Sequence, residues 1–237
     1  MKNKIILPTV LTKDSWFYEG NKELCEPHLG KPYISYSTVS SWSEYNDSVI
    51  KQKFAGIKLP EGIYGSLGSF AGYALEHGKF PDNNPHGFTG QENMNLEELR
   101  PENAEYEKMI LIDRGAYLII GFIDRIHEYE EGLLHLRDQK TGGAKKEDSY
   151  KSLGYIQVIL YAHAIEQQYP DKKIGKTDVY FIRRTKSHIN PPLHISEEQF
   201  EIPLEYSPER VKYALDKVDR VVNEISDLYA TYLKFFC

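Results

Sequence analysis

The chain has 237 residues and a net charge of −6 at pH 7, with 41% hydrophobic and 27% charged residues. These values are ordinary for a soluble globular protein with one full core, and they argue against a protein that coats nucleic acid by charge alone. No run of residues approaches the roughly 18 apolar positions that span a bilayer, and the N-terminal apolar stretch is too short for a secretory signal.

Cysteine is scarce, with Cys25 and Cys237 as the two in the chain. Their wide separation does not match the spacings of disulfide frameworks or of cysteine-rich metal sites. The sequence therefore predicts a reduced chain that works in the cytoplasm, without disulfides and without membrane attachment.

The first part of the chain predicts two helices. Residues 1–34 show no clear hydrophobic period, and their prolines favour an irregular lead-in. From Ser35, the segment SYSTVSSWSEYNDSVIKQKFAG predicts a helix that is capped by Ser37 or a neighbouring hydroxyl. A second helix, rich in small residues, is expected over residues 64–78. Residues 79–95 contain Pro, Asn and Gly and predict a loop.

The period of the apolar residues then changes to that of strands. Three strands are predicted at 108–113, 116–129 and 133–140, followed by a helix at 149–169, a strand at 177–184, a proline-containing loop and an amphipathic helix at 207–236. This order indicates an α/β (α+β) fold, in which a small mixed central sheet with an antiparallel three-strand meander is flanked by helices.

The turn between the second and third predicted strands sets which residues face each other. A three-residue turn over Glu130–Gly132, with the glycine left-handed, places Asp124 directly opposite Asp138. Facing Cβ atoms in such pairs lie roughly 4.5–5.5 Å apart. Strand alternation puts Lys140 on the same face as Asp138. Two carboxylates and one ammonium therefore converge on a face that is otherwise apolar.

Facing carboxylates repel each other, and one lysine neutralises only one of them. A divalent cation would neutralise both, because Mg²⁺ favours one or two carboxylates together with water and phosphate oxygens. A lysine beside such an ion could act on the attacking water or on a phosphate, which is the chemistry of phosphodiester hydrolysis. A partly buried cross-strand salt bridge is the alternative interpretation.

The spacing of Asp124 and the triplet Asp138-Gln139-Lys140, 14 positions later, resembles that of the PD-(D/E)xK nuclease superfamily. Ile123 replaces the proline of that pattern. The segments GFIDRI, LHLRDQKTG and GYIQVILYA are similar to the RecB-type and lambda-exonuclease-like phage branch. The resemblance covers about residues 33–185. It implies a single nuclease domain over 1–237, with a lead-in at 1–34, a restriction-endonuclease-like core at 35–185 and a C-terminal helix at 207–236.

The resemblance implies a catalytic site with one or two Mg²⁺ or Mn²⁺ ions, at which Lys140 assists the attacking water. The implied metal ligands are Glu76, Asp124, Asp138 and the backbone carbonyl of Gln139. Some RecB-type relatives carry an iron–sulfur cluster held by four cysteines. Two cysteines cannot supply those ligands, so no cluster is expected.

Two predicted helices contribute further implied site residues. The register Gly72-x-x-x-Glu76 matches the lambda-exonuclease-like form and favours Glu76 as the acid, whereas the register one turn earlier would end on Gly72. His77 would point about 100° away and is expected to be solvated. Gln157, one helical turn before Tyr161, is implied to position water or a phosphate. An ordinary amphipathic helix with a surface glutamine and a core tyrosine is the alternative.

The implied function is that of a metal-dependent DNA exonuclease in phage-type recombination, repair or processing. The candidates for contacting DNA are Thr141, Lys145, Lys146, Tyr161, Arg183 and Arg184, and for the basic residues a solvated surface is the alternative. The resemblance admits a recombination or single-strand-annealing partner and a ring-like homo-oligomer in a bacterial or phage-infected cytoplasm. Three alternatives stay open: an endonuclease or junction resolvase with the same site, a non-catalytic DNA-binding protein, and an enzyme that acts on RNA.

Overall fold

The computed structural model describes residues 4–44, 47, 50–185 and 193–236. The chain groups into two compact units, each made of segments that are distant in sequence. The first unit comprises Met1–Leu59, Met109–Gly121 and Val211–Cys237, and the second comprises Pro60–Lys108 and Phe122–Arg210. The expectation of a single domain stays a prediction. No helix among the described residues is both long enough and apolar enough to cross a membrane.

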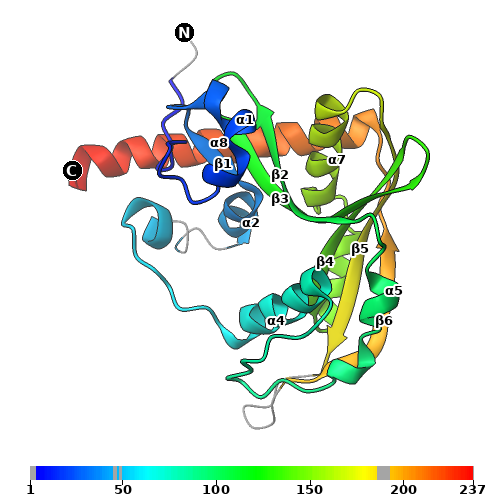
Figure 1. The fold of residues 1–237 in the computed structure, drawn as a ribbon. Helices are drawn as coiled ribbons and strands as arrows, with labels where there is room; N and C mark the ends of the chain where they lie inside the picture. The colour runs from blue at the N-terminus through cyan, green and yellow to red at the C-terminus, as the bar shows by residue number, and fades with distance from the viewer. Residues whose placement is uncertain (1–3, 45–46, 48–49, 186–192, 237) are drawn as a thin grey trace. The chain divides into compact units, whose positions relative to one another are not determined.

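Among the described residues, six strands form one mixed sheet in the order β1-β3-β4-β5-β6, with β2 paired to β3 (Figure 1). The strands are β1 (Tyr33–Ser35), β2 (Glu105–Asp113), β3 (Leu118–Glu130), β4 (Leu133–Gly142), β5 (Lys173–Arg184) and β6 (Ile195–Pro203). β1 is parallel to β3, β4 is antiparallel to β3 and parallel to β5, and β6 is antiparallel to β5. The predicted fold class, a mixed sheet flanked by helices, is confirmed.

In the first unit, short helical turns precede β1 and a longer helix follows it. The turns are η1 (Glu19–Asn21), α1 (Lys22–Cys25) and η2 (Glu26–His28), and the longer helix is α2 (Tyr36–Glu44). The backbone N–H of Thr38 donates to Ser35 Oγ at 3.3 Å, so the hydroxyl that caps the helix belongs to Ser35 and not to Ser37. Residues 45, 46, 48 and 49 of the predicted helix lie outside the described residues, and a π-helical turn, η3 (Ile50–Phe54), comes next.

Most of α8 (Pro208–Phe236), the predicted C-terminal helix, belongs to the first unit. Its Asp219 accepts two hydrogen bonds from Arg114, at 3.2 and 2.6 Å, and one from the hydroxyl of Tyr117. Trp42 of α2 donates its indole N–H to Glu224 of α8 at 2.8 Å. These bonds fix α8 to α2 and to the β2–β3 turn.

The β3–β4 hairpin has the predicted register but a different turn. Four facing pairs keep the predicted spacing: Arg125–Arg137, Ile126–Leu136, His127–His135 and Glu128–Leu134. Glu130 then faces Leu133, so the turn has two residues, and the register shift falls at Tyr129. The predicted three-residue turn is therefore wrong. The bulge at Tyr129 adds back the missing residue, and Gly132 is left-handed as expected, with φ of 74°.

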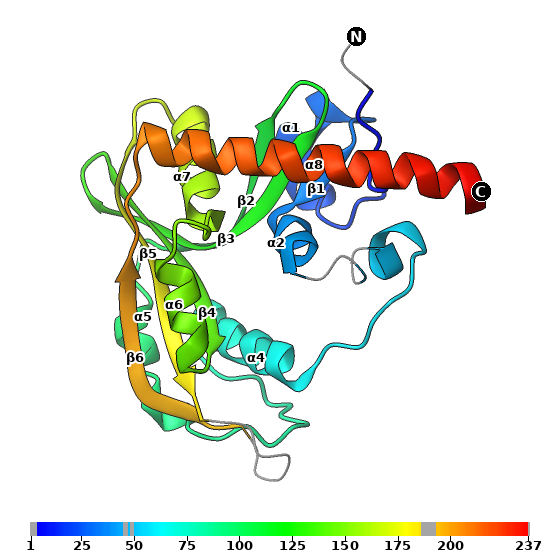
Figure 2. The same ribbon diagram turned by 180° about the vertical axis from the view of Figure 1, so that it is seen from behind.

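The second unit contains the other helices, seen from both sides in Figures 1 and 2. They are α4 (Ile63–His77), η4 (Gln91–Asn93), α5 (Leu96–Leu99), α6 (Ala144–Lys151) and α7 (Gln157–Gln168). The single helix predicted over 149–169 is wrong, because the chain leaves the helix at Ser152 (φ −74°, ψ 153°). The Ser152 hydroxyl donates to the carbonyl of Ser149 at 2.7 Å, a local bond that competes with helix continuation.

Strand β6 was not predicted from the sequence. Its segment, ISEEQFEIP, carries three acidic residues, and it lies at the edge of the sheet, where the strand order of the described residues ends. Charged residues are common on edge strands and weaken the hydrophobic signal that marks a strand. Residues 186–192 of the predicted proline-containing loop lie outside the described residues.

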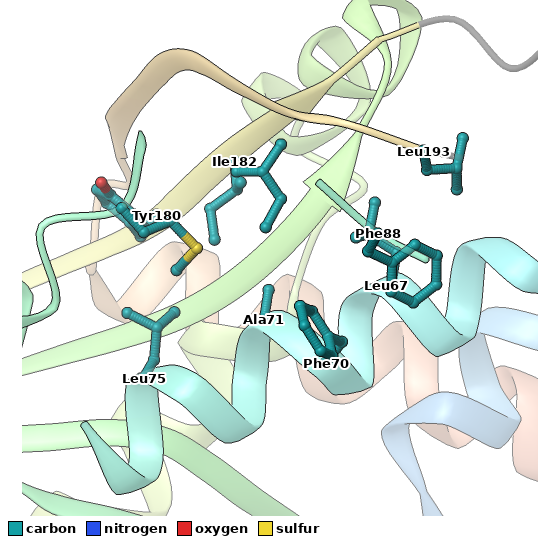
Figure 3. Packing of buried hydrophobic residues seen from close by; sticks show 10 residues of the cluster. Leu67, Phe70, Ala71, Leu75, Phe88, Tyr180, Ile182 and Leu193 are labelled. Atoms are coloured by element: carbon teal, nitrogen blue, oxygen red, sulfur yellow. The ribbon is translucent and has the colours of Figure 1, made fainter. Parts of the chain in front are cut away.

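Helix α4 packs its apolar face on the second unit's core. Leu67, Phe70, Ala71 and Leu75 contact a cluster that includes Phe88, Tyr180, Ile182 and Leu193 (Figure 3). The neighbouring flank of the helix carries glycines at 65, 68 and 72 and an acid at 76. The packing of one face therefore fixes where the glycine flank lies.

Strand β4 is held to β5 by buried charges. The guanidinium of Arg137 donates to both carboxylate oxygens of Asp178, at 2.7 and 2.8 Å, and His135 Nε2 lies 2.6 Å from the same carboxylate. Burial alone would raise the pKa of Asp178, but the hydrogen bonds from His135 and Arg137 outweigh it and lower the pKa. Because β4 side chains alternate, this network fixes the strand from the face opposite Asp138.

Candidate active site

Asp124 of β3 and Asp138 of β4 lie close together just beyond Arg125–Arg137, the last facing pair of the hairpin on this side. The backbone N–H of Gln139 donates to Asp124 Oδ2 at 2.6 Å. Lys140 Nζ lies 2.5 Å from Asp138 Oδ2. The two acids and the lysine therefore form one group at the same place on two neighbouring strands.

The two oxygens of Asp138 have different surroundings. Oδ2 accepts a hydrogen bond from the hydroxyl of Tyr155 at 2.5 Å and pairs with Lys140. Oδ1 is buried and has no hydrogen-bond partner among the described residues, and the whole side chain is 1% exposed. A buried carboxylate oxygen without a partner is unfavourable, so this atom is suited to bind a cation.

Electrostatics at the site leave an excess of negative charge. Burial and the charge of Asp138 raise the pKa of Asp124 to about 7, although Lys140 and the Gln139 amide act in the opposite direction. Burial would lower the pKa of Lys140, but Asp138 and Asp124 outweigh it and raise the pKa, so Lys140 stays an ammonium. One cation does not neutralise the group, which favours the binding of another.

Glu107 of β2 is a site residue that the sequence did not indicate. It lines the same cavity as Asp124, Lys140 and Glu76, and burial together with the charge of Glu76 raises its pKa. Its φ of 49° is positive, and among the described residues no other non-glycine has this. Such backbone strain is concentrated at functional sites. The predicted strand began one residue later, at Lys108, so Glu107 was assigned to no predicted element.

Glu76 of α4 lines this cavity, as the favoured register predicts. Its side chain is 40% exposed, and Oε2 lies 3.6 Å from Nδ1 of His77. The ring of His77 stacks on Tyr73 at a centroid distance of 3.9 Å. His77 does not line the cavity, in keeping with the solvated position expected for it. The charge of Glu76 raises the pKa of Glu107, which shows that the two carboxylates are close to each other.

Gln157 and Tyr161 form a buried chain of polar contacts behind Asp138. Gln157 Oε1 lies 3.3 Å from the Tyr155 hydroxyl, and its amide donates to the Tyr161 hydroxyl at 3.2 Å. Burial and the charge of Asp138 raise the pKa of Tyr161. Gln157 is 9% exposed and Tyr161 is 5% exposed, so this structure places both beside the acids and away from any open surface.

The remaining candidates for DNA contact lie in different surroundings. Thr141 lines the cavity, whereas Lys145 and Lys146 are exposed on α6. Arg183 forms ion pairs with Glu147, at 2.9 Å, and with Glu198. The guanidinium of Arg184 lies 3.9 Å from the ring centroid of Tyr64, which also lines the cavity.

The residues present fit a divalent cation held by two carboxylates. Within the described part of the chain, no three Asp, Glu, His or Cys side chains converge closely enough to hold a metal by themselves. Mg²⁺, however, is commonly bound by one or two carboxylates, with water and substrate phosphate as the other ligands. Asp138 Oδ1 is available, and Asp124 lies close enough for the charge of Asp138 to raise its pKa.

Comparison with known proteins identifies the family. The family model of the PD-(D/E)XK nuclease superfamily matches residues 85–233. The chain belongs to this superfamily and is a nuclease. No curated protein matches the chain.

Two solved structures are similar to the chain. A "putative exonuclease" from Eubacterium rectale is 16% identical, with a TM-score of 0.50, over 92% of this chain and 88% of that one. The structure of SSO0001 is 18% identical, with a TM-score of 0.42, over 86% of this chain and 84% of that one. At these identities the first likeness supports the fold alone.

We predict that Asp124→Asn stabilises the metal-free protein. Because the folded state raises the pKa of Asp124 to about 7, stability from its protonation is present below the usual value of 3.8 and is lost as the pH rises through 7. In EDTA, the melting temperature of the variant should exceed that of the parent by a few degrees at pH 8 and by less at pH 5. Equal melting temperatures at both pH values would contradict the buried repulsion.

We also predict that Tyr155→Phe weakens metal binding without unfolding the protein. The hydroxyl orients Asp138 through Oδ2, and loss of such an outer-shell bond typically costs about 10–100-fold in metal affinity. Mn²⁺ affinity is measured by calorimetry, beside a thermal melt. Tyr206→Phe, which removes a 2.7 Å tyrosine–carboxylate bond to Glu166, is the matched control. Unchanged Mn²⁺ affinity in Tyr155→Phe would show that the tyrosine is merely structural.

Proposed function

We propose that this nuclease is a Mg²⁺- or Mn²⁺-dependent DNA exonuclease of the RecB-type and lambda-exonuclease-like branch. The observation that carries the proposal is the pairing of Asp124 with Asp138, whose Oδ1 is buried without a partner beside an ammonium group. The exonuclease assignment rests on the motif resemblance of GFIDRI, LHLRDQKTG and GYIQVILYA. A role in phage-type recombination, repair or processing rests on the same resemblance.

In the proposed site, Asp138 Oδ1 and Asp124 hold the ion, and the backbone carbonyl of Gln139 is a further candidate ligand. Glu107 and Glu76 line the cavity from β2 and α4 and are suited to complete the shell or to hold a second ion. A bound divalent ion supplies Lewis-acid activation of the phosphate and of water.

Lys140 acts in this proposal as a fixed cation. Its pKa is raised by the neighbouring carboxylates, so it keeps its proton and does not take one from water. An ammonium group at this position orients the attacking water and stabilises negative charge that builds on the phosphate. Gln157 and Tyr155 hold Asp138 in place from behind, so that Lys140 is presented in one orientation.

The test compares linear and covalently closed double-stranded DNA, with Mg²⁺ and with EDTA, for the parent and for Lys140→Ala. We expect degradation of linear DNA alone, abolished by EDTA and reduced by roughly 10²-fold or more in the variant. Lys212→Ala, which removes an exposed lysine of α8, is the control and should match the parent.

Each other outcome changes the assignment. Cutting of the closed circle would identify an endonuclease or junction resolvase that uses the same site. Cleavage of RNA but not DNA would change the substrate class. Binding of DNA without metal-dependent cleavage would contradict the enzymatic proposal and favour a binding protein on a nuclease fold.

A further inference from the structure

A cavity of about 530 Å³ runs along the flank of α4 beside the paired acids. One wall is formed by Gly65, Gly68, Gly72 and Glu76 of α4, and the other includes Asp124 and Lys140. We call this cavity the α4 groove. At a rise of 1.5 Å per residue, the wall from Gly65 to Glu76 is about 16 Å long.

Gly68 and Gly72 of this wall have no structural cause within the second unit, whereas a Cβ atom on Gly65 would lie 2.9 Å from Cγ of Glu61. All three glycines are helical, and none has a positive φ. A Cβ atom built on Gly72 meets nothing within 4 Å, and one on Gly68 meets only Thr141 Oγ1, at 3.5 Å. Glycine is the least favourable helix residue after proline. Alanine would therefore fit at positions 68 and 72 and would favour the helix, so these two glycines are better explained by something that must approach the helix backbone.

Aromatic and cationic groups lie along the same wall. Tyr64 and Tyr73 line the α4 groove and are 44% and 36% exposed. Arg184 lies over the ring of Tyr64, at 3.9 Å, and so places a positive charge there. Exposed aromatic rings that stack on bases, together with cations that contact the backbone, are the features by which proteins bind single-stranded nucleic acid.

The depth of the acids favours a flexible substrate. Asp138 is 1% exposed, so a phosphate must enter between α4 and the sheet to come near it. Duplex DNA is stiff, with a persistence length of about 150 base pairs, whereas a single strand bends freely. A strand that enters the groove brings its backbone against glycine and its scissile phosphate toward the acids.

We propose that the α4 groove binds a single DNA strand, with the sugar–phosphate backbone against Gly68 and Gly72. This inference rests on the proposed nuclease function and specifies its substrate as a single-stranded end or tail. Tyr64 and Tyr73 stack on bases at the rims, and Arg184 contacts a phosphate near Tyr64.

The test introduces bulk at Gly72 and at a matched position outside the groove. Gly72→Leu should reduce kcat/KM on single-stranded DNA by about tenfold or more, the effect of losing one stacked base, while Mn²⁺ affinity is kept. Gly72→Ala should raise the melting temperature. Ser66→Leu, on the same helix but outside the groove, should cleave like the parent.

The parent should also cleave single-stranded DNA faster than blunt duplex. A preference for blunt duplex, or unchanged cleavage of single strands by Gly72→Leu, would overturn the inference and leave the nuclease proposal intact. If the parent cleaves no DNA, the nuclease proposal fails. In that case, the anisotropy of a fluorescent single-stranded oligonucleotide in EDTA tests separately whether the α4 groove binds a single strand. Weaker binding by Gly72→Leu than by the parent supports this inference, and equal binding overturns it.

Discussion

Repulsion between two carboxylates held close together on β3 and β4 is the constraint on which the rest of the second unit depends. Asp124 is held beside Asp138 although burial and the charge of Asp138 make the charge of Asp124 unfavourable, as its raised pKa indicates. Oδ2 of Asp138 is satisfied by Lys140 and by the hydroxyl of Tyr155. Oδ2 of Asp124 is satisfied by the backbone amide of Gln139. One oxygen of Asp138 is left over, and it is the atom that gives the site its chemistry.

The surrounding structure keeps this unfavourable pair in position. The Arg137–Asp178 ion pair fixes β4 to β5 from the opposite face, and the chain from Gln157 to Tyr161 packs behind Asp138. The apolar face of α4 is held by the core (Figure 3). Its glycine flank lines the same cavity as Asp124 and Lys140. A rigid support for a strained polar group is what precise catalytic geometry requires.

The parts of the site that sequence could predict are those set by local rules. Gly132 marks a left-handed turn and alternation assigns faces, and together they predict the pairs from Arg125–Arg137 to Glu128–Leu134 even though the turn length was wrong. Glu107 was missed because its positive φ and its proximity to Glu76 depend on tertiary structure, which no periodicity records.

Tyr155 was missed for a related reason. In one continuous helix over 149–169, the side chains of Tyr155 and Gln157 would point in different directions. Because α7 begins only at Gln157, Tyr155 lies outside the helix, and its hydroxyl reaches Asp138. The sequence did not indicate the break, because the hydrogen bond of Ser152 that accompanies it is a feature of the folded chain.

The most direct test of the central claim is the anomalous diffraction of a crystal of this protein grown with Mn²⁺. We predict a Mn²⁺ peak between Asp124 and Oδ1 of Asp138, within coordination distance of both. A well-ordered crystal with both side chains visible and no peak there, or with Mn²⁺ bound only at another group of acids, would contradict the claim that the paired aspartates form the metal site.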